Sequence, residues 1–178
     1  MQDQNNSFEL FKKLNPGIFY QHNYRPVIIA DNLRTPENMG SVLRLAANIG
    51  ALKTLFISET AHQFKSYKIK RTASGAYEKT DWKIIRYEEL GNELPEGYRL
   101  IALETTTKAQ SIYSYGFPDK VAFCIGNEKN GIRRELLEQD AQHLYIPLPG
   151  PVTSLNTTHA LSVALFEWYR QMMLKRPV

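Results

Sequence analysis

The sequence predicts an α/β fold in which a mostly parallel sheet is flanked by helices. Short β-branched runs alternate with helical patterns along the chain, as they do in βαβ units. Several of these runs are apolar throughout, which is expected of strands that helices cover on both faces. The 178 residues are also enough for one domain with a substantial core. We expect that domain to span residues 25–178, after a short helix and a tether in residues 1–24.

Six runs have the length and composition of strands, namely residues 27–30, 54–57, 83–86, 100–103, 121–125 and 144–146. In α/β folds, ligands bind at the carboxyl ends of parallel strands. The polar groups that follow four of these runs, after Ala30, Leu103, Ile125 and Ile146, are therefore expected to converge on one crevice.

The helix with the clearest boundaries is expected between Thr35 and Gly50. Thr35 is a favourable N-cap, Pro36 suits the first helical position, and Gly50 suits the end. The apolar stripe of this helix consists of Met39, Val42, Leu43, Ala46 and Ile49. Its polar side consists of Glu37, Gly40, Ser41, Arg44 and Asn48. Two later helices are expected at residues 133–139 and 157–174, the second with Leu161, Ala164, Leu165 and Trp168 facing inward.

The composition argues against several classes of protein. Hydrophobic residues make up 43% and charged residues 22%, as in ordinary globular domains. No apolar run approaches the roughly 20 residues of a membrane span, and the start is polar, so we expect a cytoplasmic protein without a membrane partner. The four histidines lack ligand spacing and Cys124 has no second cysteine, so we expect no metal. Cys124 itself, in an apolar run, is expected to be a buried, inert thiol.

Two common nucleotide-binding loops are absent from the sequence. The segment from Gly126 to Gly131 has the glycine spacing of a phosphate-binding loop, but Ile132 and Arg133 follow where Lys-Ser or Lys-Thr is required. No dinucleotide-binding glycine fingerprint follows any predicted strand, which argues against a Rossmann-like oxidoreductase.

A basic segment is the main candidate for contact with nucleic acid. The net charge of +4 permits an RNA or DNA partner. Within one short polar segment the chain carries Lys65, Lys68, Lys70 and Arg71, with Tyr67 among them. Such a patch can hold phosphates while an aromatic ring stacks on a base. A solvated loop or helix face explains the same composition equally well.

Three segments couple a predicted strand end to a turn that a ligand can approach. They contain Asn38-Met39-Gly40 with Arg44, then Ile125-Gly126-Asn127-Glu128 with Gly131, then Ile146-Pro147-Leu148 with Gly150 and Ser154-Leu155-Asn156. Each segment alone fits a helix surface, a turn or a helix cap. Together, in this order and at these spacings, they resemble the three signature motifs of the SpoU (TrmH) family of tRNA and rRNA ribose 2'-O-methyltransferases, in the SPOUT superfamily. The resemblance covers about residues 26–170 and includes residues 72–76.

The resemblance implies an α/β fold whose C-terminal part is threaded into a trefoil knot, which is an exception to the general absence of knots. It also implies a homodimer. In this family the cofactor S-adenosylmethionine lies bent in the knotted loops and is held largely by backbone groups. The corresponding residues here are Leu103, Glu104, Thr105, Gly126, Ile146, Leu148 and Leu155.

The implied reaction transfers a methyl group from a sulfonium to a ribose 2'-hydroxyl. The site must align oxygen, carbon and sulfur and help to remove a proton. By the resemblance, Arg44 is placed at the 2'-hydroxyl and its neighbouring phosphate. Asn38, Glu128, Ser154 and Asn156 organise Arg44 and the substrate. Because arginine stays protonated, a phosphate clamp is favoured for Arg44 over a general base.

The chain departs from the family's pattern after Asn156. The family continues with small apolar residues and a serine, whereas this chain has Thr157-Thr158-His159-Ala160. Thr158 preserves a hydroxyl at the serine position, and His159 is either a helix-start residue or a substrate contact. The departure leaves the detailed cofactor contacts open.

Structured RNA is the expected substrate, with a slight preference for tRNA over rRNA because the chain lacks a separate RNA-binding domain. A non-catalytic RNA-binding or cofactor-binding module with the same fold is the alternative. The presence of Arg44, Glu128, Ser154 and Asn156 favours the enzyme.

Overall fold

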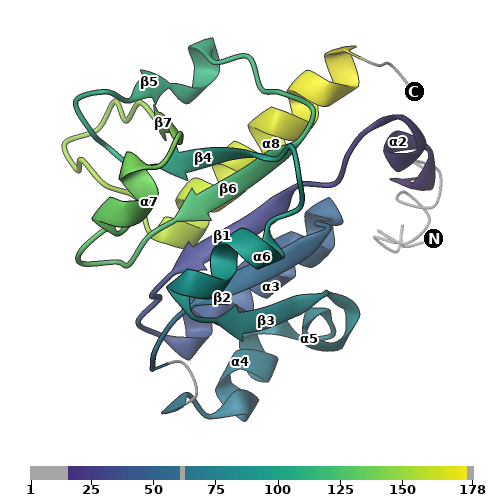
Figure 1. Ribbon diagram of the computed structural model, residues 1–178, viewed down its shortest axis with the longest axis vertical. Helices are drawn as coiled ribbons and strands as arrows, with labels where there is room; N and C mark the ends of the chain where they lie inside the picture. The colour runs from purple at the N-terminus through teal and green to yellow at the C-terminus, as the bar shows by residue number, and fades with distance from the viewer. Residues whose placement is uncertain (1–15, 61–62, 176–178) are drawn as a thin grey trace, which may run out of the picture.

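Seven parallel strands form one sheet in the computed structural model, which describes residues 16–60 and 63–175 (Figure 1). The strands are β1 Val27–Asp31, β2 Lys53–Ile57, β3 Trp82–Ile85, β4 Arg99–Leu103, β5 Gln110–Ser111, β6 Val121–Ile125 and β7 Gln142–Tyr145. Their order across the sheet is β3-β2-β1-β6-β4-β7-β5, and all six pairings are parallel. The predicted α/β class with a mostly parallel sheet is confirmed.

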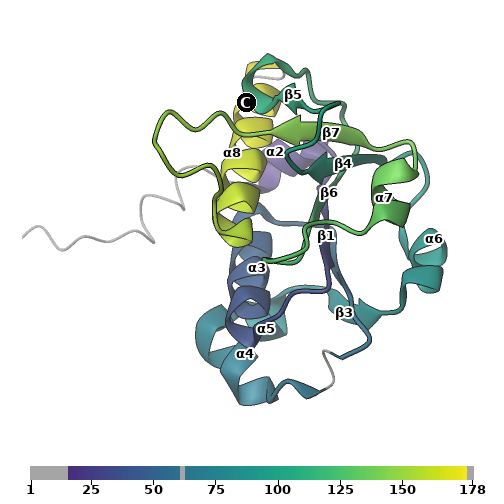
Figure 2. The ribbon, with the colours of Figure 1, turned by 90° about the vertical axis from the view of Figure 1, so that its left-hand side faces the viewer.

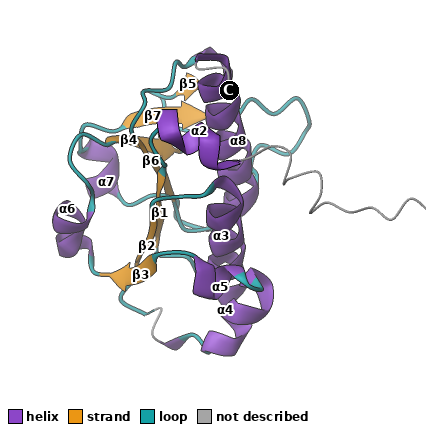
Figure 3. Cartoon of the chain, turned by 90° about the vertical axis from the view of Figure 1, so that its right-hand side faces the viewer, coloured by secondary structure: helices purple, strands orange, loops and turns teal. Residues whose placement is uncertain are grey.

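Helices cover both faces of this sheet (Figures 2 and 3). One face carries α2 Pro16–His22, α3 Pro36–Ile49, α4 Ser66–Ala73, α5 Ala76–Lys79 and α8 Thr157–Lys175. The other carries α6 Leu90–Glu93 and α7 Arg134–Glu138. The described residues also include the 3-10 turns η2 Tyr87–Glu89 and η3 Ile112–Ser114. Among residues 16–60 and 63–175, none of the helices combines the length and the apolar character that a membrane crossing requires.

The two helical layers bury alternate residues of the same strands. In β1, Ile28 and Ala30 belong to the core under α3 and α8, whereas Val27 and Ile29 belong to the core on the other face. Every residue of β1 and β6 is buried. Strands covered on both faces need no polar alternation, which explains why β6 is apolar throughout and β1 is apolar up to its last residue, Asp31.

The predicted elements agree with the observed ones to within about two residues, which is the ordinary uncertainty of element ends. α3 has Thr35 as its N-cap, with the Thr35 hydroxyl accepting a hydrogen bond from the Asn38 backbone N–H at 3.2 Å. It ends at Gly50, whose φ of 67° lies in the left-handed region that glycine tolerates. The short helices α4, α5 and α6 and the two-residue strand β5 were not predicted as separate elements.

The N-terminal helix predicted within residues 1–24 is observed as α2. Its Phe19 is buried and packs against two aromatic rings of α8, with ring centroids 6.1 Å from Trp168 and 4.8 Å from Tyr169. α2 is therefore attached to the core. The rest of this N-terminal segment, residues 1–15, lies outside the described residues, so the predicted tether stays a prediction.

The position predicted for Gly40 is wrong. Gly40 was placed on the polar side of α3, but it is buried because α4 packs directly on it. A Cβ atom at this position would lie 2.6 Å from the carbonyl oxygen of Ile69 and 2.7 Å from the Cβ of Thr72. Glycine is therefore needed for the close approach of two helices, and residues 72–76, at the junction of α4 and α5, belong to that contact.

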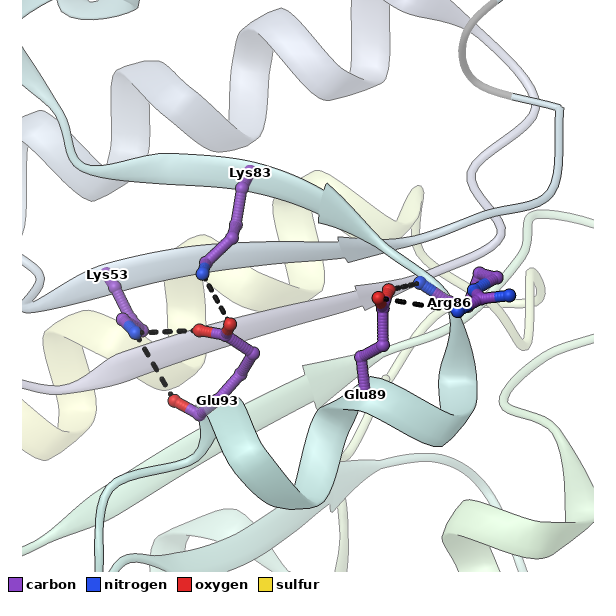
Figure 4. Close-up of polar contacts among 5 residues, drawn as sticks. All are labelled: Lys53, Lys83, Arg86, Glu89 and Glu93. Carbon is purple, nitrogen blue, oxygen red and sulfur yellow. Dashed lines mark hydrogen bonds and ion pairs between the residues drawn. The ribbon is translucent and has the colours of Figure 1, made fainter.

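α6 is tied to the far edge of the sheet by one carboxylate (Figure 4). Glu93, the last residue of α6, accepts hydrogen bonds from Lys83 on β3 and from Lys53 on β2, the latter at 3.1 Å. The Lys53 ammonium also reaches the Glu93 carbonyl oxygen at 3.3 Å. The Lys83 ammonium, followed by Lys53, lowers the pKa of Glu93.

This arrangement predicts a pH-dependent contribution to stability. A carboxyl whose pKa is lowered on folding stabilises the protein above its unfolded-state pKa and loses that effect as the pH falls through the folded-state pKa. Glu93→Gln should therefore lower the free energy of unfolding in urea at pH 7, and the difference from the wild type should shrink towards pH 3. Glu88→Gln, at an exposed carboxylate nearby, is the matched control and should change neither value. Equal losses at both pH values would contradict the assignment.

Candidate functional site

A cleft of about 460 Å³ opens at the carboxyl ends of β4, β6 and β7, beside the first turn of α8. It is lined by Leu103, Glu104, Thr105, Gly126, Asn127, Glu128, Lys129, Gly131, Leu144, Tyr145, Ile146, Leu148, Thr153, Ser154, Leu155, Asn156, Thr157 and Ala160. These include every residue that the family resemblance assigned to the cofactor. Of the residues assigned to catalysis, Glu128, Ser154 and Asn156 line the cleft, and Arg44 and Asn38 do not.

The turn after β6 forms one wall of the cleft. Asn127 and Gly131 pair through both backbone hydrogen bonds, at 3.0 and 2.9 Å, and the Asn127 side chain accepts the N–H groups of Lys129 and Asn130. A Cβ on Gly126 would lie 2.2 Å from the carbonyl carbon of Gly131. Gly131 has a φ of 70°. The shape of the turn therefore requires glycine at both positions.

Side chains from the neighbouring strand ends hold this turn in place. The Asn127 amide donates to the carbonyl oxygen of Asn32, just after β1, at 2.7 Å. The Glu104 carboxylate, at the end of β4, accepts the backbone N–H of Ile132 at 3.0 Å and that of Thr105 at 3.1 Å. The Glu104 side chain therefore bonds to the protein's own backbone while it lines the cleft.

Glu128 connects the cleft to the start of α3. One carboxylate oxygen accepts a hydrogen bond from the side-chain amide of Asn38, and the other accepts the backbone N–H of Arg34 at 3.0 Å. Two residues from different motifs, 90 positions apart, are thereby brought into direct contact. The polar groups after β1 were predicted to converge on the crevice, but none of residues 31–38 lines it. Asn32 and Asn38 instead bond to two lining residues, Asn127 and Glu128.

Arg44 lies away from the cleft of its own chain. It is exposed on α3, as the helical pattern predicted, six residues after Asn38 and so about 9 Å farther along the helix axis. Within the described part of the chain its guanidinium has no ion-pair partner. It is therefore a free cation that a phosphate can approach.

The residues before and within the first turn of α8 close the cleft. The side-chain oxygen of Asn156 accepts the backbone N–H of Thr158 at 2.8 Å and its hydroxyl at 2.7 Å, so Asn156 acts as a helix cap. The Thr157 hydroxyl donates to the carbonyl oxygen of Gly126 at 3.1 Å, which joins α8 to the turn after β6. His159 is exposed in the first turn of α8. Ser154 is exposed at the rim.

The basic segment predicted to contact nucleic acid extends along α4, from its N-cap Lys65 to Lys70 and Arg71 in its last turn. Lys70 pairs with Glu78 at 3.2 Å and Arg71 lies 3.9 Å from Glu37, all with exposed side chains. Such surface pairs are weak and do not prevent contact with phosphates. Lys65 and Lys68 have no ion-pair partner among the described residues, so these two carry the uncompensated charge of the segment.

Cys124 is buried in β6, and burial raises its thiol pKa above the ordinary range. The predicted burial of the thiol is confirmed, and a raised thiol pKa disfavours the thiolate, which is the reactive form. In residues 16–60 and 63–175 there is no group of three or more His, Cys, Asp or Glu side chains placed to hold a metal ion.

Residues 25–166 match the family model described as the SpoU rRNA Methylase family. The chain belongs to this family. It is 30% identical over 152 residues to the 23S rRNA (guanosine-2'-O-)-methyltransferase RlmB of Xylella fastidiosa, with 83% of this chain and 59% of that protein covered. It is 26% identical to the mouse tRNA (guanosine(18)-2'-O)-methyltransferase TARBP1, with 84% of this chain and 10% of that protein covered. The chain thus spans less than two thirds of the length of these relatives.

Solved structures of SpoU proteins share the fold. One, described as giving insight into the 2-OH methylation of C/U34 on tRNA, superposes with a TM-score of 0.76 at 30% identity, covering 84% of this chain and 97% of the other. The TrmH/SpoU tRNA modifying enzyme of A. aeolicus superposes with a TM-score of 0.75 at 19% identity, covering 96% of this chain and 86% of the other.

Several residues that line the cleft were not predicted from the sequence, among them Lys129, Thr153 and Thr157. All three lie within or next to a SpoU motif, and this proximity is the signal in the sequence that points to them. The side-chain anchors of the turn after β6 were not predicted either. These depend on contacts between residues far apart in the sequence, which no local pattern reveals.

The geometry of this turn predicts a large effect of a small substitution. Gly126→Ala places a methyl group within 2.5 Å of three backbone atoms of Gly131 and Ile132, so the turn must open. We expect faster hydrogen exchange of the Asn127 and Gly131 amides, measured by mass spectrometry. Gly116→Ala is the control, because no atom lies within 4 Å of its added Cβ. Unchanged exchange in Gly126→Ala would show that the turn tolerates a side chain.

Proposed function

We propose that this chain transfers a methyl group from S-adenosylmethionine to a ribose 2'-hydroxyl of structured RNA. The observation that supports this best is the gathering of residues from the second and third SpoU motifs around one cleft, with the first motif joined to it through Asn38 and Glu128. The activities named for the relatives agree with it.

The residues of the cleft fit S-adenosylmethionine. The volume of about 460 Å³ lies in the range of small-molecule sites. Leu103, Ile146, Leu148 and Leu155 supply apolar surface for a purine ring, and the backbone at Thr105 and Gly126 supplies polar groups. When bound, the cofactor supplies an electrophilic methyl group on a sulfonium.

The remaining residues would orient the acceptor. In this proposal Arg44 clamps the phosphate beside the reacting ribose and thereby fixes the 2'-oxygen, since a guanidinium matches phosphate geometry. Glu128 holds Asn38 and the Arg34 backbone, which sets the position of α3 relative to the cleft. Ser154 at the rim and Asn156 at the start of α8 shape the opposite wall. Positioning of this kind is a large part of the catalysis expected here.

We further propose a homodimer and a C-terminal trefoil knot. Arg44 is exposed and does not line its own chain's cleft, which supports an arrangement in which a partner subunit supplies it. For the knot, the support is that the chain passes from β7 through the residue 146–156 loop and returns as α8, which packs against β4 and β6 (Figure 2).

The RNA is proposed to be tRNA or rRNA, with the slight preference for tRNA retained. Relatives named for each class are found, so the comparisons support both. Lys65 and Lys68, with Lys70 and Arg71 beside them, are the proposed RNA contacts on α4. Residues 25–178 are proposed as the methyltransferase domain, after the N-terminal segment.

The direct test is methyl transfer. Labelled S-adenosylmethionine is supplied with separate tRNA and rRNA pools from a strain that lacks this gene, and the product is mapped by mass spectrometry. A 2'-O-methylated nucleotide in one pool supports the proposal and identifies the RNA class. Binding of S-adenosylhomocysteine without transfer to either pool would favour the alternative, a non-catalytic binding module.

Arg44→Ala should abolish methyl transfer while leaving the fold and the affinity for S-adenosylhomocysteine nearly intact. Arg44 is exposed and lies outside the cleft, so its loss removes a substrate contact only. Turnover, circular dichroism and calorimetric titration measure the three quantities. Normal turnover of this variant would remove Arg44 from the mechanism.

The dimer can be tested by complementation as well as by light scattering. If each site takes Arg44 from one subunit and Ser154 from the other, mixing the Arg44→Ala and Ser154→Ala proteins, each inactive alone, should restore about a quarter of wild-type activity after subunit exchange, as two-fold symmetry requires. Either variant alone is the control. A monomer at working concentration, or an inactive mixture whose subunits have exchanged, would contradict the shared site.

A further inference from the structure

A buried ion pair lies beneath the turn after β6 and outside the cleft. Asp31 is the last residue of β1, and only 3% of its side chain is exposed. Its carboxylate accepts two hydrogen bonds from Arg133, which follows the turn in the sequence: the backbone N–H donates to Oδ2 at 2.8 Å and Nε donates to Oδ1 at 2.8 Å. Nη2 of Arg133 also lies 2.7 Å from Oδ1.

The surroundings protect this pair from water. The Arg133 side chain is 27% exposed, and its guanidinium lies 5.0 Å from the centre of the Tyr87 ring. The Tyr87 hydroxyl in turn accepts a hydrogen bond from Gln139 at 2.8 Å. A charged pair in which both carboxylate oxygens accept hydrogen bonds, and which is partly shielded from water, is stronger than an exposed one.

The pair fixes the point where the chain leaves the turn. The entrance is held where Asn127 bonds to Asn32, directly after Asp31. Asn32 itself has a φ of 52°, and its backbone N–H donates to Ile57 at 2.8 Å. Entrance and exit of the turn are thus both attached to the last residues of β1, and Glu128 lies between them.

We propose that Asp31 and Arg133 are positioning residues for methyl transfer, which act by holding Glu128 in register with α3. This inference rests on the proposed function of the cleft. Neither side chain lines the cleft, so neither touches cofactor or substrate directly. The pair holds the turn after β6 in place. This turn positions Glu128 against Asn38 and forms the wall of the cleft that faces the cofactor.

The test compares Arg133→Gln with Arg134→Gln in the full chain. Arg134 is the next residue, and its pair with Glu138 is exposed, with side-chain exposures of 85% and 61%. At saturating cofactor and RNA, and well below the unfolding temperature, we expect Arg133→Gln to lower kcat roughly 10- to 100-fold, the effect of a displacement of about 1 Å. Arg134→Gln should retain wild-type kcat. The amides of Asn127 and Gly131 should exchange faster in Arg133→Gln alone.

Two further variants separate positioning from stability. Arg133→Lys keeps the charge but loses the fork of donors, so it should recover part of kcat. Asp31→Asn keeps the size of the side chain and should lower kcat as Arg133→Gln does, and the double variant should be no slower than either single one. If Arg133→Gln fails to fold, Asp31→Asn and Arg133→Lys carry the test.

A lower unfolding temperature with wild-type kcat and wild-type amide exchange would overturn the inference, because it would show a purely structural pair. Additive losses in the double variant would overturn it as well. If the wild-type protein methylates no RNA, the proposed function fails, and the exchange of the Asn127 and Gly131 amides still decides whether the pair holds the turn.

Discussion

The close approach of Gly126 to the backbone of Gly131 and Ile132 is the constraint on which the cleft depends. Because no side chain intervenes, the turn closes on itself and Asn127 can pair with Gly131 through both backbone bonds. The returning arm then lies within reach of carboxylates from two different strands. A methyl group on Gly126 would widen the turn. Ile132 and Arg133 would then move away from the carboxylates of Glu104 and Asp31, and the wall of the cleft would shift.

The parallel sheet explains why both anchors are available. β6 lies between β1 and β4, so the turn that follows it is flanked by the carboxyl ends of both neighbours. Asp31 and Asn32 reach it from one side and Glu104 from the other. Thr157 of α8 then bonds to Gly126 from the direction of the last helix. Three segments distant in the sequence therefore determine one small piece of backbone, which is the kind of over-determination that a preorganised site requires.

The sequence predicted the elements well because their signals are local. The cap at Thr35, the stop at Gly50 and the apolar run of β6 depend only on neighbouring residues, and all three are observed. Gly40 was misplaced because its burial depends on α4, whose polar sequence gave no separate helix signal. The Asp31–Arg133 pair joins residues 102 positions apart, and Asn38 meets Glu128 across 90. Such partners depend on the order of the strands in the sheet, which the periodicity of the sequence does not reveal. The motif resemblance identified the residues of the cleft but not the contacts that hold them in place.

The position of Arg44 links this internal order to assembly. Glu128 uses one carboxylate oxygen for Asn38 and the other for the Arg34 backbone, so the start of α3 and the turn after β6 behave as one unit. Arg44 lies on the same rigid helix, which packs on α4 at Gly40 and on α8. A partner that docks on this face would therefore receive an arginine whose position is already tied to the cleft of the donating subunit. The hydrogen bonds that shape the cleft of one subunit would then also position the Arg44 that this subunit places in the cleft of its partner. Both sites of a symmetric dimer would therefore depend on the same few contacts.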